Sequence, residues 1–173
     1  MNETGQNIIN TPSGEKIKKG IWHILETVYD PEIPVLSVID LGIVRDVKVS
    51  EENIEIIITP TYSGCPAMDV IAMNIRIAMI KEGFLSLKIS HQLSPAWTTD
   101  WMSEAGKQKL KSYGIAPPVG KSFDENYLEN LIVECPLCHS QHTKLISQFG
   151  STSCKAHYQC LDCKEPFDYF KCH

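Results

Sequence analysis

The chain has 173 residues, 43% of them hydrophobic and 21% charged. Its net charge of −5 argues against a general nucleic-acid-binding protein, which would need a basic face to neutralise phosphates. Residues 1–14 are polar and read as a flexible lead-in rather than a signal peptide, and no apolar run approaches the length of a membrane span. We therefore expect a cytoplasmic protein, in which the seven cysteines are metal ligands or reactive thiols before they are disulfides.

Hydrophobic spacing predicts six elements in residues 15–114, in the order helix, strand, strand, helix, strand, helix. The helices are expected over residues 15–29, 66–82 and 99–113, and the strands over residues 42–49, 54–59 and 85–93. Pro66 suits the first position of the second helix, and Gly83 suits its C-terminal cap. The order predicts an α+β domain of two layers, with helices packed on a small sheet.

A second, smaller unit is expected after a proline-rich linker at residues 115–126. Residues 127–173 contain two CxxC pairs, Cys135–Cys138 and Cys160–Cys163, separated by 21 residues. Two such pairs at this separation predict a tetrahedral four-cysteine site in a β zinc ribbon. Four segments are expected to supply its strands: residues 131–135, 143–149, 156–160 and 166–172. Iron uses the same ligand pattern, so the pattern leaves the metal open.

Energetics favour a structural role for this metal. About 45 residues cannot bury enough surface to offset roughly 1–2 kcal/mol of backbone entropy each. A structural zinc ion adds on the order of 10–16 kcal/mol. Cys154 and Cys172 remain, as spare thiols, as a cross-strand pair facing each other in a hairpin, or as alternative ligands. The four nearby histidines are expected at the surface, although any of them would be an alternative ligand: His139, His142, His157 and His173.

The remaining cysteine, Cys65, stands alone in the first 134 residues, between Gly64 and Pro66. It is expected beside a helix N-cap, where the helix dipole stabilises an anion by about 0.3–2 kcal/mol and would lower the pKa of the thiol to roughly 7–8. Gly64 is expected to let the backbone approach closely. Hydroxyl side chains lie nearby in the sequence at Thr59, Thr61, Tyr62 and Ser63. The alternative is an inert cysteine packed under the helix.

Two acidic segments are candidates to share a pocket with this thiol. They contain Asp30 and Glu32 in the first, and Asp40 in the second. Asp and Gly are ordinary turn residues, so turn chemistry alone explains each segment. If the carboxylates converge on Cys65, however, they form a plausible transient iron site.

Two long motifs carry a resemblance. DPEIPVLSVIDLGIV, at residues 30–44, and TPTYSGCPAMDV, at residues 59–70, resemble the signature of the metal–sulfur cluster biosynthesis family, which includes SufT-type proteins. With CPLC and GSTSCKAHYQCLDCKEPFDYFKCH, the two-part layout resembles the accessory D subunits of bacterial phenylacetyl-CoA ring-epoxidase systems. The resemblance covers nearly the whole chain.

This resemblance implies an Fe–S-assembly-type fold and a maturation factor, more an assembly factor than a catalyst, for an iron or Fe–S centre of the oxygenase of aerobic phenylacetate degradation. Its partners would be subunits of that complex or other iron proteins. The reactive position it implies is Cys65, with Asp30, Glu32 and Asp40 in the shared acidic motifs. Related cluster scaffolds carry a CxxC here, so a single thiol favours transient binding of iron or a cluster. The missing ligands would come from a second copy in a homodimer, a partner protein or the carboxylates.

Three other functions are considered. A non-catalytic adaptor would bind oxygenase subunits and use Cys65 for packing alone. A cysteine hydrolase or transferase would need a base, and His23 and His91 are the candidates in the first domain. Nucleic-acid binding through the ribbon conflicts with the net acidity.

Overall fold

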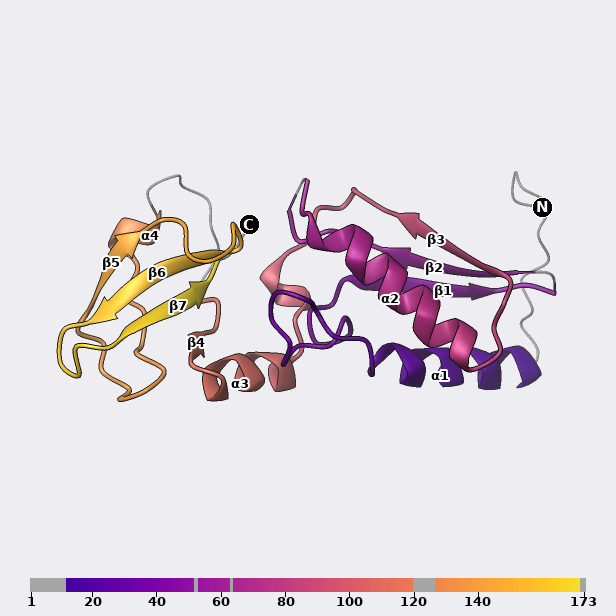
Figure 1. The fold of residues 1–173 in the computed structure, drawn as a ribbon, viewed down its shortest axis with the longest axis horizontal. Coiled ribbons are helices and arrows are strands. Elements are labelled where there is room, and N and C mark those ends of the chain that lie inside the picture. The colour runs from indigo at the N-terminus through magenta and orange to yellow at the C-terminus, as the bar shows by residue number, and fades with distance from the viewer. Residues whose placement is uncertain (1–11, 52, 63, 120–126, 172–173) are drawn as a thin grey trace. The chain divides into compact units, whose positions relative to one another are not determined.

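The computed structural model describes residues 12–51, 53–62, 64–119 and 127–171, with side chains from Gly14 onward. Its contacts divide the chain into two compact units, residues 1–97 and residues 98–173. The sequence analysis expected domains at residues 15–114 and 127–173, joined by a linker at residues 115–126. These domains stay a prediction of which segments fold independently. Each compact unit is described by itself below (Figure 1).

The first unit is a three-stranded sheet with two helices. Its elements are α1 (Pro12–Leu25), β1 (Val44–Val49), β2 (Ile54–Ile58), α2 (Ala67–Lys81) and β3 (Leu87–His91). The strand order is β1-β2-β3, with β1 antiparallel and β3 parallel to β2. Parallel neighbours need a crossover, and α2 supplies it. In Figure 1, α2 lies in front of the strands, and α1 contacts both β1 and α2.

The core of this unit lies between the sheet and the helices. Its fully buried side chains come from every layer and include Ile21, Leu25, Ile56, Ile58, Ile75 and Met79. Trp97, at the end of the unit, is also buried, and its indole Nε1–H donates to the Leu41 carbonyl at 2.9 Å. The predicted helix–strand order and two-layer class are therefore confirmed here.

The two helices of this unit end for different reasons, α2 at a local glycine signal and α1 before a segment that pairs elsewhere in the chain. The α2 helix ends as predicted at Gly83, whose φ of +88° suits glycine, and the amides of Gly83 and Phe84 bond to the carbonyls of Ile80 and Met79. The α1 helix ends at Leu25, four residues before the predicted end. Residues 28–29 instead pair with residues 37–38, where the Val38 amide donates to the Val28 carbonyl at 2.9 Å.

The second unit is a four-stranded sheet preceded by short helices. It contains η1 (Thr99–Trp101), α3 (Glu104–Ser112), β4 (Ile115–Ala116), α4 (Tyr127–Asn130), β5 (Thr143–Ser147), β6 (Lys155–Cys160) and β7 (Pro166–Phe170). The strand order is β4-β7-β6-β5, parallel between β4 and β7 and antiparallel elsewhere. The C-terminal β unit is therefore confirmed. None of the described helices of either unit is long and apolar enough to cross a membrane.

Three details of this unit differ from the predictions. The expected helix over 99–113 is broken at Ser103, whose hydroxyl caps α3 by accepting from the Gly106 amide at 2.8 Å. Ile115 and Ala116, expected in the linker, form β4 and pair with β7. Residues 131–135, expected as a strand, belong to none; the Val133 carbonyl instead accepts from the Thr143 hydroxyl at 2.7 Å.

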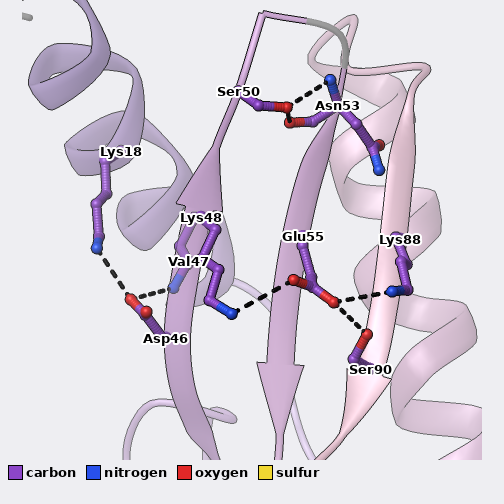
Figure 2. A network of polar contacts seen from close by, with 9 residues as sticks. All are labelled: Lys18, Asp46, Val47, Lys48, Ser50, Asn53, Glu55, Lys88 and Ser90. Carbon is purple, nitrogen blue, oxygen red and sulfur yellow. Dashed lines mark hydrogen bonds and ion pairs between the residues drawn. The ribbon is translucent and has the colours of Figure 1, made fainter. Parts of the chain in front are cut away.

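The face of the first sheet that looks away from α2 is polar, and Figure 2 shows Glu55 at its centre. Glu55 on β2 faces Lys48 on β1 and Lys88 on β3 in the strand register. Its carboxylate accepts from the Ser90 hydroxyl at 2.6 Å and lies 3.1 Å from Lys88 Nζ and 3.6 Å from Lys48 Nζ. The Ser90 hydrogen bond, followed by the two lysines, lowers the pKa of Glu55 below 4.5 despite partial burial.

We expect Glu55→Gln to lower the free energy of unfolding by about 1–2 kcal/mol at neutral pH, because it removes one charged partner of two lysines. A carboxyl group with a lowered folded pKa stabilises above its unfolded pKa and loses this effect as the pH falls through the folded value. The difference between wild type and variant should therefore shrink below about pH 4.5. Urea unfolding across pH 3–7 measures it; a difference independent of pH would contradict the assignment.

Candidate functional site

The four predicted ribbon cysteines meet at one place. Their sulfur atoms all lie within 4.8 Å of one another, with 3.8 Å between Cys135 and Cys163 and 3.5 Å between Cys138 and Cys160. Each pair lies in a tight turn followed by a residue with positive φ, namely His139 at 64° and Lys164 at 69°. The two turns therefore repeat the same local geometry on both sides of the cluster.

The spacing of the sulfur atoms fits a tetrahedral metal. Zinc–sulfur bonds of about 2.3 Å at tetrahedral angles put sulfur atoms about 3.8 Å apart, close to both of the measured pairs. The buried Cys135 and Cys160 also belong to the apolar core of the unit, next to Tyr158 and Phe167. A metal held here would join the two turns to that core, as the predicted zinc ribbon requires.

The thiols of the cluster differ in acidity. Burial acts to raise the pKa of Cys160, but hydrogen bonds from the backbone of Cys163 and Asp162 and from neighbouring thiols lower it to about 6. At Cys163 a backbone hydrogen bond from Glu165 acts to lower the pKa, but burial and three neighbouring thiols raise it to about 12. One thiolate thus opposes ionisation of the next, and a bound cation would remove that opposition.

The histidines near the cluster contact carboxylates. Ring nitrogens of His139 and His142 lie 2.8 Å from Glu134 and 3.2 Å from Asp162. The ring of His157 likewise pairs with Asp168, and His173 lies outside the described residues. Within the described chain, the close ligand group consists of the four cysteines.

The two leftover cysteines can be placed in part. Cys154 is buried, and its sulfur lies 3.0 Å from the hydroxyl of Thr152. Cys172 lies outside the described residues, so the expectation that it faces Cys154 is untested.

Cys138→Ser should abolish metal binding with little direct loss of packing, because Cys138 is the exposed member of the cluster. Metal analysis should show about one zinc ion per wild-type chain and close to none in the variant. The loss, on the order of 10–16 kcal/mol of binding energy, exceeds what a small domain can spare, so β-sheet circular dichroism should fall. Cys154→Ser is the matched control and should keep its metal; full occupancy in Cys138→Ser would refute the ligand set.

Cys65 lies in the loop between β2 and α2, and its side chain is half-buried. Its amide donates to the Tyr62 carbonyl and its carbonyl accepts from the Met68 amide, both at 3.3 Å. Pro66 is the N-cap residue rather than the first helical residue, so Cys65 directly precedes the cap. Gly64 has a φ of +80°, which favours glycine, and apart from its chain neighbours no described atom lies within 4 Å of where its Cβ would be.

Thr59 differs from the other hydroxyl residues of this loop in its burial and in its hydrogen bonding. It follows β2 directly and is 1% exposed. Its Oγ1 is the buried side-chain oxygen that, among the described residues, has no hydrogen-bond partner. A buried hydroxyl without a partner lowers the free energy of unfolding by about 1–3 kcal/mol, so the loop holds Thr59 in this position at a cost in stability. The sequence named Thr59 as one of four nearby hydroxyl residues but gave no reason to prefer it.

The acidic residues shape their own turns. One oxygen of Asp30 accepts from the amides of Glu32 and Ile33, at 2.8 and 2.7 Å. Asp40 is buried, and one of its oxygens accepts from both the amide and the hydroxyl of Ser37, at 3.1 and 2.9 Å. The Asp30 contacts form an Asx-type turn. The Ser37–Asp40 contacts are reciprocal, because the Asp40 amide donates back to Ser37 Oγ at 3.0 Å, as in a capping box.

The convergence of these carboxylates on the lone thiol stays a prediction. Within the described residues, no group as tight as the ribbon cluster includes Cys65, and Glu32 is half-buried on the first acidic turn. Among the described residues, neither candidate base, His23 or His91, forms a hydrogen bond with Cys65. His23 is exposed and lies 3.0 Å from Glu26, and His91 is exposed at the end of β3.

Asp40→Ala should lower the free energy of unfolding by about 1–3 kcal/mol, because it leaves the buried amide and hydroxyl of Ser37 without their acceptor. Glu51→Ala, at an exposed acidic position, is the control and should change it by less than about 0.5 kcal/mol. Urea titration of both variants checks the difference. Equal stability of the two variants would show that the Ser37–Asp40 contact does not hold the turn.

Two family models match the two units. Residues 18–82 match the model described as iron-sulfur cluster assembly protein, and residues 121–171 match the PaaD zinc beta ribbon domain. A protein of Escherichia coli (strain K12), provisionally named as the D subunit of 1,2-phenylacetyl-CoA epoxidase, is 52% identical over 88% of this chain and 91% of its own length. An Fe-S protein maturation auxiliary factor of Porphyromonas gingivalis (strain ATCC BAA-308 / W83) is 37% identical over 54% of this chain and 90% of its own.

A solved structure supports the fold of the first unit. A domain of unknown function, DUF59, from Bacillus anthracis superposes with a TM-score of 0.52 and 27% identity. The match covers 56% of this chain and 92% of that one. The predicted combination of an Fe–S-assembly-like domain with a zinc ribbon is therefore confirmed.

Proposed function

The chain belongs to the family of 1,2-phenylacetyl-CoA epoxidase D subunits, and on that premise we propose that it is an accessory factor in the maturation of an iron centre. Its client would be a component of the multicomponent phenylacetyl-CoA oxygenase of aerobic phenylacetate degradation. The cargo would be iron or an Fe–S cluster, passed on rather than kept.

The observation that carries this proposal is the position of Cys65. It precedes the N-cap of α2, is half-buried, and lies within the segment that matches the iron-sulfur cluster assembly model. A cysteine ligates metal through its thiolate, not its thiol. On binding, the thiol would release its proton as the sulfur–iron bond forms.

A single protein thiolate suits transfer better than storage. An Fe–S cluster takes four ligands. Cys65 supplies one, so the remaining ligands would come from a client protein, a second copy or carboxylates. Asp30 and Asp40 support the proposal as residues that shape the acidic turns, and Glu32 as the further carboxylate of the first turn.

The ribbon would serve the same function indirectly. Its cysteines would hold a structural zinc ion, which fixes the surface of the C-terminal unit for docking to the oxygenase. Partner recognition and metal transfer would then reside in different units of the chain. Because of this separation, a mutation can remove partner recognition without removing metal transfer, or metal transfer without partner recognition.

Cys65→Ser should leave the free energy of unfolding nearly unchanged, because the hydroxyl is close to the thiol in size, but should remove a metal ligand. We expect the iron content of an oxygenase co-expressed with the variant to fall severalfold relative to wild type. Cys154→Ser, a cysteine outside the matched assembly segment, is the control. Iron occupancy that stays at the wild-type level with Cys65→Ser would remove the transfer role.

A non-catalytic adaptor is the second candidate, favoured by the turn contacts of Asp30 and Asp40 and by the absence of a close ligand group around Cys65 in the described chain. For an adaptor, Cys65→Ser would be silent, whereas Cys138→Ser would abolish pull-down of the oxygenase subunits. Cys65→Ser therefore separates the two functions, whereas Cys138→Ser is expected to abolish pull-down under both, because both place docking in the ribbon.

A further inference from the structure

The two cysteine turns of the ribbon are joined by side chains outside the ligand set. The hydroxyl of Ser140, which follows the first turn, donates to one carboxylate oxygen of Asp162 at 2.5 Å. A ring nitrogen of His142 lies 3.2 Å from the other oxygen of the same carboxylate. Asp162 itself lies inside the second turn, between Cys160 and Cys163. Its carboxylate therefore ties the segment after the first turn to the second turn.

The Ser140 hydroxyl has a defined role in this contact. Its oxygen accepts from the amide of His142 at 2.9 Å, and its proton goes to Asp162, because an ionised carboxylate can only accept. Hydrogen bonds to a charged group are about twice as strong as those between neutral groups. The side chain of Asp162 is 57% exposed, however, so water screens its contribution to overall stability. Its effect is expected at the metal site instead.

The same two residues contact the ligand sulfur atoms through their backbones. The amide of Ser140 donates to the sulfur of Cys138, and the amide of Asp162 donates to the sulfur of Cys160. These two sulfur atoms belong to opposite CxxC pairs and lie 3.5 Å apart. The contact between Ser140 and Asp162 thus joins two residues that each hold one ligand sulfur, one from each turn.

We propose that Asp162 is a positioning residue of the metal site, which holds the two cysteine turns together through Ser140 and slows exchange of the bound metal. The proposal rests on the zinc site of the proposed function and extends it to a residue that orients the ligands. Cys138 is the exposed ligand, so a competing chelator reaches the metal on this side. While the contact is made, both amides stay directed at their sulfur atoms. Outer contacts of this kind change metal affinity by about 10–100-fold.

Zinc release from the full-length chain tests the proposal. Once metal analysis shows about one zinc ion per chain, an excess of the chromophoric chelator 4-(2-pyridylazo)resorcinol reports the rate of release. Asp162→Ala and Ser140→Ala should each raise this rate by about tenfold or more, and the double variant should be no faster than the faster single one, because both remove the same contact. The amide of Leu161 still donates to the carbonyl of His142 at 2.7 Å, so the zinc-bound variants should keep the circular dichroism of the wild type.

Asp168→Ala is the matched control. Asp168 also pairs with a histidine, His157 at 3.3 Å, and with the buried Lys155 at 3.3 Å, but it lies on β7, outside the cysteine turns. Its loss should lower the urea midpoint, because Lys155 is left buried without its partner. The rate of zinc release should nevertheless stay within about twofold of wild type, because the two sites share no partner. The control separates loss of this contact from loss of overall stability.

Cobalt(II) in place of zinc gives a readout that a purely structural contact would not move. Loosening the N–H···S bond from Asp162 to Cys160 raises the energy of the sulfur lone pairs. The sulfur-to-cobalt charge-transfer band should therefore move to longer wavelength in Asp162→Ala and stay in place in Asp168→Ala.

Four results would each overturn the proposal: zinc release from Asp162→Ala within about twofold of wild type, additive effects in the double variant, an unshifted cobalt band in Asp162→Ala, or equal acceleration by Asp168→Ala. A wild type that binds no zinc would refute the metal site and this proposal with it. Neither readout involves Cys65, so failure of the transfer role and failure of this proposal are told apart.

Discussion

The parallel pairing of β2 with β3 is the constraint on which the N-terminal unit depends. Parallel neighbours cannot be joined by a hairpin, so the chain must return along the sheet, and α2 makes that return. The helix consequently begins beside the carboxyl end of β2, and the loop that connects them carries Cys65 just before the N-cap. The position of the thiol at the positive end of a helix therefore follows from strand topology. The same return leaves one side of α2 facing away from the sheet, where Val70, Met73, Ile77 and Ile80 are exposed.

The C-terminal unit depends on a different interaction. The four thiols lie within 4.8 Å of one another, and the pKa of Cys163 is raised by its three neighbouring thiols. Two of the four, Cys135 and Cys160, are part of the apolar core. A divalent cation converts this repulsion into four metal–sulfur bonds, and so contributes to folding what a small core cannot. The hydrogen bonds of His139 and His142 to carboxylates hold the turns around the cluster without adding ligands. The proposed structural role of this metal would leave Cys65, the cysteine of the N-terminal unit, available for exchange.

Sequence reasoning reached the features that local chemistry determines. The CxxC spacing identified the four-cysteine cluster, the order of elements identified the two-layer unit, and Gly83 marked the end of α2 because few other residues adopt its positive φ. Sequence reasoning failed where contacts with distant segments determine the local structure. The α1 helix stops at Leu25 because residues 28–29 pair with residues 37–38, and β4 exists because β7 lies beside it. Whether Asp30, Asp40 and Cys65 converge is a question of the same kind, since each lies on a different loop.

The contacts of Asp30 and Asp40 bear on how a single thiol can handle iron. Each carboxylate already accepts two hydrogen bonds within its own turn, and its use as a metal ligand would compete with those bonds. Under the proposed transfer role, a client protein or a second copy would complete the coordination sphere with its own side chains. An iron ion or cluster that takes its other ligands from the client protein would be bound most stably while it is being transferred. A delivery factor needs this property, and a storage scaffold does not.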